Sequence, residues 1–164
     1  MIQALILIAP NVTGAPAAVY SPDIQSLRLR LMEAEKTGDI DQAIALRMTL
    51  SLDGPSQSKD RIVSDTRLLF VDMNSVALQS QPTGANLDNS TTYHRLSEIS
   101  MPSLVIYGDL DLAATQERSR HVANALNGSS HVLHGAAHLP SLEQPGQVTD
   151  LLVAFINRCS GRSV

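Results

Sequence analysis

The sequence predicts an α/β fold with about three parallel strands, flanking helices and a helical insertion. Three short segments, 4–9, 103–107 and 130–134, are typical of strands. The first is a continuous apolar run, as expected for a strand covered on both faces, and the second is also mainly apolar. Helical periodicity separates the last two strands, and a helical crossover joins parallel strands. The 164 residues suffice to bury a core.

The first strand is followed by helical segments. Residues 22–36 are predicted to form a helix, because Ser21 is a suitable N-cap and Pro22 suits a first turn. Gly38 and Asp39 end this helix and begin a second one at about 40–51. The insertion is therefore expected to open with two helices joined by a tight turn.

A third helix of the insertion is predicted at about 59–80, after Ser58. Its apolar stripe consists of Leu69, Met73, Val76 and Ala77. Such stripes more often pack than bind, but Phe70 and Met73 could serve either packing or a pocket. The polar segment 81–92 is predicted to be the most mobile loop.

The last third of the chain alternates strands with helices. After the strand at 103–107, a loop at 108–114 is expected to lead to a helix that Thr115 caps and that ends near Leu126. The inward face of that helix is predicted to consist of Ser119, Val122, Ala123 and Leu126. A loop at 135–143 then precedes a final helix at about 145–158. Its apolar face is predicted to consist of Val148, Leu151, Leu152, Phe155 and Ile156.

Composition excludes some classes of partner. The net charge is −4, and Lys and Arg form no cluster that could serve as a nucleic-acid surface. The apolar run at 4–9 is too short to span a bilayer and lacks the preceding positive charge of a secretion signal. Cys159 is the single cysteine, so a reducing compartment is the default. We expect a cytoplasmic protein that binds neither nucleic acid nor membrane.

Acidic and histidine side chains follow the second and third strands. Asp109 and Asp111 come directly after Gly108, and His138 lies in the loop after the third strand. Functional residues of open α/β sheets gather at the carboxyl ends of the strands. A carboxylate there can fix the tautomer of an imidazole and stabilise its protonated form. The alternative is that these polar residues only cap turns.

The three histidines His131, His134 and His138 have a spacing that could suggest a metal site. Strand alternation argues against it, because His131 would point to the opposite face of the strand from His134. A zinc set would also need further Cys or His ligands. We therefore expect no metal and no cofactor.

Two segments resemble α/β-hydrolases. The segment Met101–Asp111, MPSLVIYGDLD, resembles their strand and acid loop, and His134–Pro145, HGAAHLPSLEQP, resembles their histidine loop. The strand at 4–9 resembles the one that follows the nucleophile helix. The segment around Gly38–Asp39 and the segment LDGP at 52–55 resemble the cap of small members of the esterase and enol-lactonase branch.

The resemblance implies a division into three parts and assigns two site residues. Residues 1–10 would be a core strand, 11–98 a cap with its connecting loop, and 99–164 the C-terminal core. Asp111 would be the catalytic acid and His138 the general base, with Asp109 a variable neighbour and His134 outside the catalytic set. The implied reaction is hydrolysis of a small ester or lactone.

The nucleophile of such a triad is absent from these residues. The family carries its serine in a Gly-x-Ser-x-Gly elbow ahead of the acid and the histidine, and the 164 residues contain no such motif. They correspond to the C-terminal portion of the family, without the nucleophile half. We therefore expect the chain to be inactive alone.

Three interpretations of this incomplete triad stay open. The chain could be a truncated gene product that retains the fold, a half completed by a complementary N-terminal hydrolase half, or a non-catalytic binding protein. The strand at 4–9 would also have an unprotected apolar edge, which favours self-association into dimers or aggregates.

Overall fold

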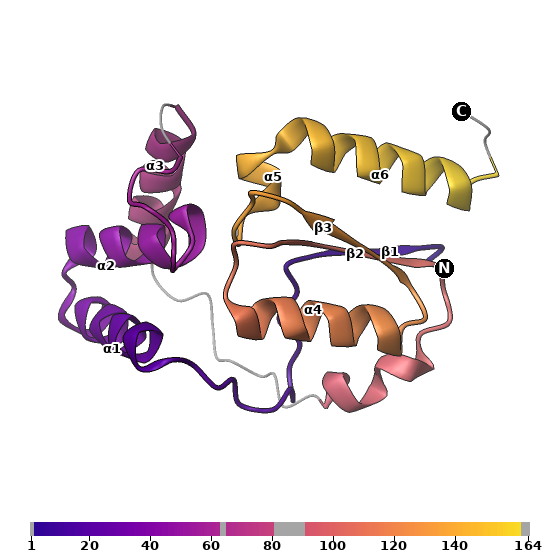
Figure 1. The fold of residues 1–164 in the computed structure, drawn as a ribbon, viewed down its shortest axis with the longest axis horizontal. Coiled ribbons are helices and arrows are strands. Elements are labelled where there is room, and N and C mark those ends of the chain that lie inside the picture. The colour runs from indigo at the N-terminus through magenta and orange to yellow at the C-terminus, as the bar shows by residue number, and fades with distance from the viewer. Residues whose placement is uncertain (1, 63–64, 81–90, 162–164) are drawn as a thin grey trace.

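The computed structural model describes residues 2–62, 65–80 and 91–161. Its centre is a parallel sheet in the order β1-β2-β3, formed by β1 (Leu5–Ile8), β2 (Ser103–Gly108) and β3 (Ser129–Leu133). Figure 1 shows all three strands running toward the helical insertion. The predicted α/β class and the three parallel strands are therefore confirmed.

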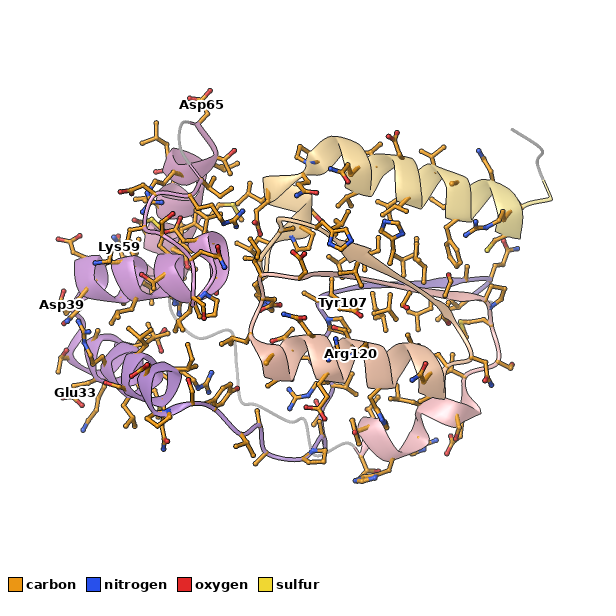
Figure 2. The ribbon with its side chains drawn as sticks, viewed as in Figure 1. Glu33, Asp39, Lys59, Asp65, Tyr107 and Arg120 are labelled. Carbon is orange, nitrogen blue, oxygen red and sulfur yellow. The ribbon has the colours of Figure 1, made fainter. Side chains whose placement is uncertain are left out.

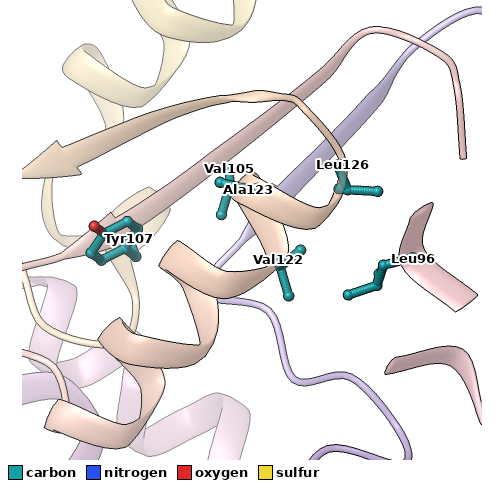
Figure 3. Packing of buried hydrophobic residues seen from close by; sticks show 6 residues of the cluster. All are labelled: Leu96, Val105, Tyr107, Val122, Ala123 and Leu126. Carbon is teal, nitrogen blue, oxygen red and sulfur yellow. The ribbon is translucent and has the colours of Figure 1, made fainter. Parts of the chain in front are cut away.

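Helices cover both faces of the sheet (Figure 1). On one face, α4 (Ala113–Ala125) and the 3₁₀ helix η2 (Thr92–Glu98) pack against Val105 and Tyr107 of β2 (Figure 3). On the other face, α6 (Pro145–Cys159), preceded by the one-turn α5 (Pro140–Glu143), packs against Leu104 and Ile106. Side chains alternate across a strand, so a strand buried on both faces is apolar throughout.

The predicted inward face of α4 is confirmed, because all four of its residues are buried. The predicted face of α6 is confirmed for Val148 and Phe155, which are buried, and for Leu151 and Leu152, which pack beside them. Ile156, in contrast, is exposed in the structure.

The helical insertion lies beyond the carboxyl ends of the strands (Figure 1). Its elements are α1 (Pro22–Thr37), α2 (Ile40–Arg47), the π-helical η1 (Met48–Asp53) and α3 (Asp65–Gln79). Ser21 caps α1 as predicted, and Gly38 ends it at a φ of 74°, a left-handed conformation that glycine adopts without strain. The side chain of Asp39 then accepts a hydrogen bond from the Gln42 N–H at 3.1 Å and caps α2.

Charged side chains occupy part of the outer surface of the insertion. Figure 2 shows Glu33, Asp39, Lys59 and Asp65 there. The apolar side chains inside form separate small cores, which centre on Ala43 and Leu46 between α1 and α2 and on Leu52 and Phe70 between η1 and α3.

Two predicted helix starts are wrong. The third helix of the insertion begins at Asp65 instead of residue 59, because Asp60 has a φ of 64° and cannot continue a right-handed helix. α4 begins at Ala113, two residues before the predicted cap Thr115. Its first turn is stabilised by the Gln116 side-chain amide, which donates hydrogen bonds to the carbonyl groups of Asp109 and Asp111.

The second helix, the loop after β3 and the apolar stripe of α3 also differ from the predictions. The predicted second helix changes at Met48 from α-helical to π-helical geometry, and the predicted loop 135–143 contains α5. The predicted stripe of α3 is exposed at Leu69, Met73, Val76 and Ala77, because α3 turns Phe70 inward instead. Residues 81–90 of the predicted mobile loop lie outside the described residues.

Among the helices of the described residues, none combines the length and the apolar character of a membrane span.

One edge of β1 is free within the described part of the chain. The N–H groups of Leu5 and Ala9 donate to β2, to the carbonyl groups of Pro102 and Ile106, at 2.9 and 2.8 Å. The N–H groups of successive strand residues alternate in direction, so those of Ile6 and Ile8 point to the other edge. No described strand pairs there. An unpaired apolar edge can pair with another chain.

We expect the 164-residue chain to form dimers or aggregates through this edge, as measured by size-exclusion chromatography with light scattering. Ile6→Pro should reduce the association, because proline removes one donor of the free edge and leaves the bonds of Leu5 and Ala9 with β2. Ile6→Ala is the matched control, because it loses the same packing and keeps the donor. A wild-type monomer, or equal association of both variants, would contradict the prediction.

Candidate active site

Asp111 and His138 meet at the carboxyl ends of β2 and β3. The Asp111 side chain is fully buried, and its Oδ2 lies 2.8 Å from Nδ1 of His138. Its Oδ1 accepts a hydrogen bond from the Leu112 N–H at 2.6 Å. Both carboxylate oxygens are thus engaged, which fixes the plane of the carboxylate toward the imidazole. The structure therefore brings together the two residues that the sequence singled out as acid and base.

The His138 ring has one nitrogen bound and one available. The carboxylate contacts Nδ1, so Nε2 is the nitrogen that can exchange a proton with a substrate or a nucleophile. The side chain is 38% exposed and lines two adjoining clefts of about 660 and 600 Å³. The backbone N–H of His138 donates to the carbonyl of Ser51 in η1 at 3.1 Å. The insertion therefore holds the backbone of His138 through this hydrogen bond.

The environment of His138 favours its protonated form. The hydrogen bond to Asp111 raises the pKa of the imidazole, burial opposes this rise, and the charges of Asp111 and Glu143 add to it. A raised pKa suits a base that must hold a proton during a reaction and then release it.

Gly108 allows the two loops to meet. We call residues 109–112 the acid loop and residues 135–139 the histidine loop. A Cβ on Gly108 would lie 2.1 Å from the carbonyl oxygen of Ala136 and 2.3 Å from that of Ala137. Leu110 N–H donates to the same Ala136 carbonyl at 2.9 Å. Only a residue without a side chain permits this backbone approach.

A second acid–histidine pair lies beside the first. Nδ1 of His134 is 2.8 Å from Oδ2 of Asp109, and Gly135 N–H donates to Oδ1 of Asp109 at 2.7 Å. The His134 side chain is 86% exposed, so this pair faces solvent, apart from Asp111 and His138. Partial burial works against ionisation of Asp109, but the hydrogen bonds from His134 and Gly135 hold its pKa below the usual value.

Metal ligands do not gather at these histidines. Within the described ranges, no three His, Cys, Asp or Glu side chains lie together as a metal site requires. His131, in the middle of β3, and His134, directly after it, are both exposed.

Two site residues were missed from the sequence. Glu143, whose side chain is 1% exposed, accepts hydrogen bonds from the backbone N–H groups of Ala137 and Leu139, on either side of His138. Arg61 forms an ion pair with Glu143. The glutamate was visible as part of the motif HGAAHLPSLEQP, but nothing in the sequence signalled Arg61, which the helical pattern had placed inside a helix.

Apolar side chains line most of the larger cleft next to His138. They come from both parts of the chain: Ile8, Leu31, Phe70, Met73, Leu139 and Leu142. Of the two residues with open alternatives, Phe70 packs in the core of the insertion, and both Phe70 and Met73 line the cleft.

The fold is a partial α/β-hydrolase fold. Similar structures are MenH from S. aureus (TM-score 0.66, 17% identity, 97% of this chain and 60% of that chain) and a thermophilic esterase from Thermogutta terrifontis (TM-score 0.64, 18% identity, 96% and 56%). The carboxylesterase CesB from Bacillus subtilis is also similar (TM-score 0.59, 19% identity, 94% and 51%). At these identities the likeness concerns the fold alone.

In sequence, the chain is similar to the epoxide hydrolase EphH of Mycobacterium tuberculosis. The two are 34% identical over 67 residues, which are 39% of this chain and 31% of that protein. The chain matches no protein-family model. It therefore spans about a third of the curated relative and about half to three fifths of the structures named above.

We expect Gly108→Ala to separate the two loops, because the added Cβ would overlap with the Ala136 and Ala137 carbonyl oxygens. The free energy of unfolding should fall by about 1–3 kcal/mol or more. NMR should show loss of the low-field proton resonance between His138 and Asp111. Gly146→Ala is the matched control, because a Cβ there meets nothing within 4 Å. Equal stability of the two variants would contradict the close approach.

The raised pKa of His138 also predicts a pH dependence of stability. A pKa raised by folding stabilises the protein below the unfolded pKa, about 6.5, and this contribution is lost as the pH rises through the folded pKa. Urea unfolding of wild type and His138→Gln should therefore differ more near pH 6 than near pH 9, since the other histidines titrate in both proteins. A difference that stays constant with pH would be inconsistent with the Asp111–His138 pair.

Proposed function

We propose that this chain supplies the general base His138 and the orienting acid Asp111 of an α/β-hydrolase that cleaves small esters or lactones. The nucleophilic serine would come from outside these 164 residues, which contain no Gly-x-Ser-x-Gly motif. The observation that carries the proposal is the 2.8 Å contact between the buried Asp111 carboxylate and a histidine whose other nitrogen is free for chemistry.

The proposed chemistry follows from this geometry. The serine hydroxyl would attack the carbonyl carbon of the ester while Nε2 of His138 takes its proton. Asp111 would stabilise the resulting imidazolium, which then gives the proton to the leaving alkoxide. In the second half of the reaction, water would attack the acyl-enzyme, and Nε2 would take the proton of the water and return it to the serine.

The clefts support a small and mainly apolar substrate. Volumes of about 660 and 600 Å³ are typical of small-molecule sites. Phe70 and Met73 of α3, together with Leu31 of α1, would then cover the acyl group, so that the insertion acts as a cap. The boundaries of this cap, residues 11–98, are part of the proposal.

Epoxide hydrolysis is a second candidate, favoured by the similarity to the mycobacterial protein of that name. A histidine–carboxylate pair can deprotonate water as well as serine. A third candidate, a non-catalytic binding protein, would keep the pair and the clefts without a nucleophile. Rates with p-nitrophenyl acetate and with styrene oxide separate the first two candidates, and inactivity of every completed form would favour the third.

We expect the 164-residue chain by itself to show no hydrolysis of p-nitrophenyl acetate that serine-directed phosphonates inhibit, because a base without a nucleophile has nothing to activate. With a Gly-x-Ser-x-Gly segment encoded upstream of Met1 or in a neighbouring gene, hydrolysis should appear. It should fall by roughly 10³-fold or more in His138→Ala and in Asp111→Asn.

The controls are His134→Ala and Asp109→Asn, which remove the second pair and should keep most of the activity. The proposal fails if the chain alone turns over the ester with phosphonate sensitivity. It also fails if the completed protein is indifferent to the loss of His138.

A further inference from the structure

Arg61 binds both the insertion and the histidine loop through one guanidinium group. Its Nε donates to the carbonyl of Asp53 and its Nη2 to that of Leu52, both at 2.6 Å. Its Nη1 donates to the carbonyl of Gly135 at 2.7 Å, and Nη2 also pairs with the Glu143 carboxylate. The first two acceptors belong to η1 and the last two to the segment that carries His138.

The Glu143 carboxylate links Arg61 to the two residues that flank His138. Its oxygens accept the N–H groups of Ala137, at 2.8 and 3.0 Å, and of Leu139, at 3.0 Å. These are the two residues that flank His138, whose own N–H is held by the Ser51 carbonyl of η1. The N–H groups of three consecutive residues, 137–139, are therefore bound either by Glu143, which Arg61 contacts, or by Ser51, which directly precedes two residues that Arg61 contacts.

Arg61 donates hydrogen bonds to carbonyl groups at the end of the helix η1. The last carbonyl groups of a helix have no partner within it. At the end of η1, those of Ser51, Leu52 and Asp53 are satisfied by His138 and Arg61. The planar guanidinium can reach several acceptors at once in fixed geometry, and a lysine ammonium cannot reproduce that pattern. The Arg61 side chain is only 17% exposed, so little water competes for these bonds.

From these contacts we infer that Arg61 is a positioning residue that transmits the placement of the helical insertion to the His138 imidazole through Glu143. The inference rests on the proposed role of His138 as the base. Displacing the insertion would move η1 and Arg61 together. The histidine loop would then no longer be held in the position at which His138 contacts Asp111. The orientation of the base would thus depend on the insertion as well as on Asp111.

The test is an NMR titration of His138 in the 164-residue chain. Arg61→Lys keeps the positive charge beside Glu143 but loses the multiple contacts, and Arg61→Met loses both. We expect the pKa of His138 to fall by about 0.5–1 pH unit in both variants, because its hydrogen bond to Asp111 loosens. The Nδ1 proton should also exchange faster with water.

Arg67→Lys is the matched control. Arg67 pairs with Asp53 and Asp60 and with the carbonyl of Ile62, all within the insertion, so its loss should lower the thermal midpoint without changing the pKa of His138. If Arg61→Met fails to fold, Arg61→Lys carries the test by itself, because lysine keeps the positive charge beside Glu143 and loses the multiple contacts.

Two results would overturn the inference. A lower thermal midpoint with an unchanged pKa and exchange rate would show that Arg61 serves stability alone. A rise in the pKa confined to Arg61→Met would show that Arg61 acts only by neutralising Glu143. The titration needs no turnover, so failure of the proposed hydrolysis and failure of this inference are separate results.

Discussion

The close backbone approach at Gly108 is the constraint on which the site depends. β2 and β3 run parallel in adjacent positions, so their carboxyl ends, and the loops that leave them, lie at the same edge of the sheet. A Cβ at residue 108 would overlap with two carbonyl oxygens of the histidine loop. Asp111 and His138 can therefore meet at 2.8 Å because the chain carries no side chain at that point.

Two ion pairs with buried carboxylates stabilise the insertion and its contact with this edge. Asp53, at the end of η1, is paired with Arg67 inside the insertion, and Glu143, in the C-terminal core, is paired with Arg61 of the insertion. Removing one partner from such a pair leaves an uncompensated charge, which is costly in the interior of a protein. Both arginines lie in the connection between η1 and α3 or at the start of α3. The irregular part of the insertion thus carries the contacts that place it relative to the sheet.

The sequence predicted the features that depend on local patterns. The apolar run of β2, the spacing of Asp111 after Gly108 and the periodicity of α6 each lie within about a dozen residues. The rule that loops at the carboxyl ends of parallel strands converge predicted that an acid and a histidine meet there. The choice of Asp111 over Asp109, and of His138, came from the resemblance to α/β-hydrolases.

Features set by particular side-chain contacts or by the backbone conformation of one residue do not follow in this way. The start of α4 is set by Gln116 and the acid loop instead of by Thr115, and the left-handed residue Asp60 breaks an apparently helical pattern. The ion pair of Arg61 with Glu143 spans 82 positions of the chain. Phe70 of α3 is buried because the helix packs against η1 through this residue. The apolar stripe in the sequence did not indicate which residues of α3 would be buried.

The most direct test of this account is the tautomer of His138, measured by long-range ¹⁵N–¹H correlation at a pH above its pKa. We expect the proton to reside on Nδ1, shared with the Asp111 carboxylate, and Nε2 to be unprotonated and able to accept a proton. Asp111→Asn should abolish this preference. A wild-type His138 protonated on Nε2, or a mixture of its two tautomers, would contradict this arrangement of the site.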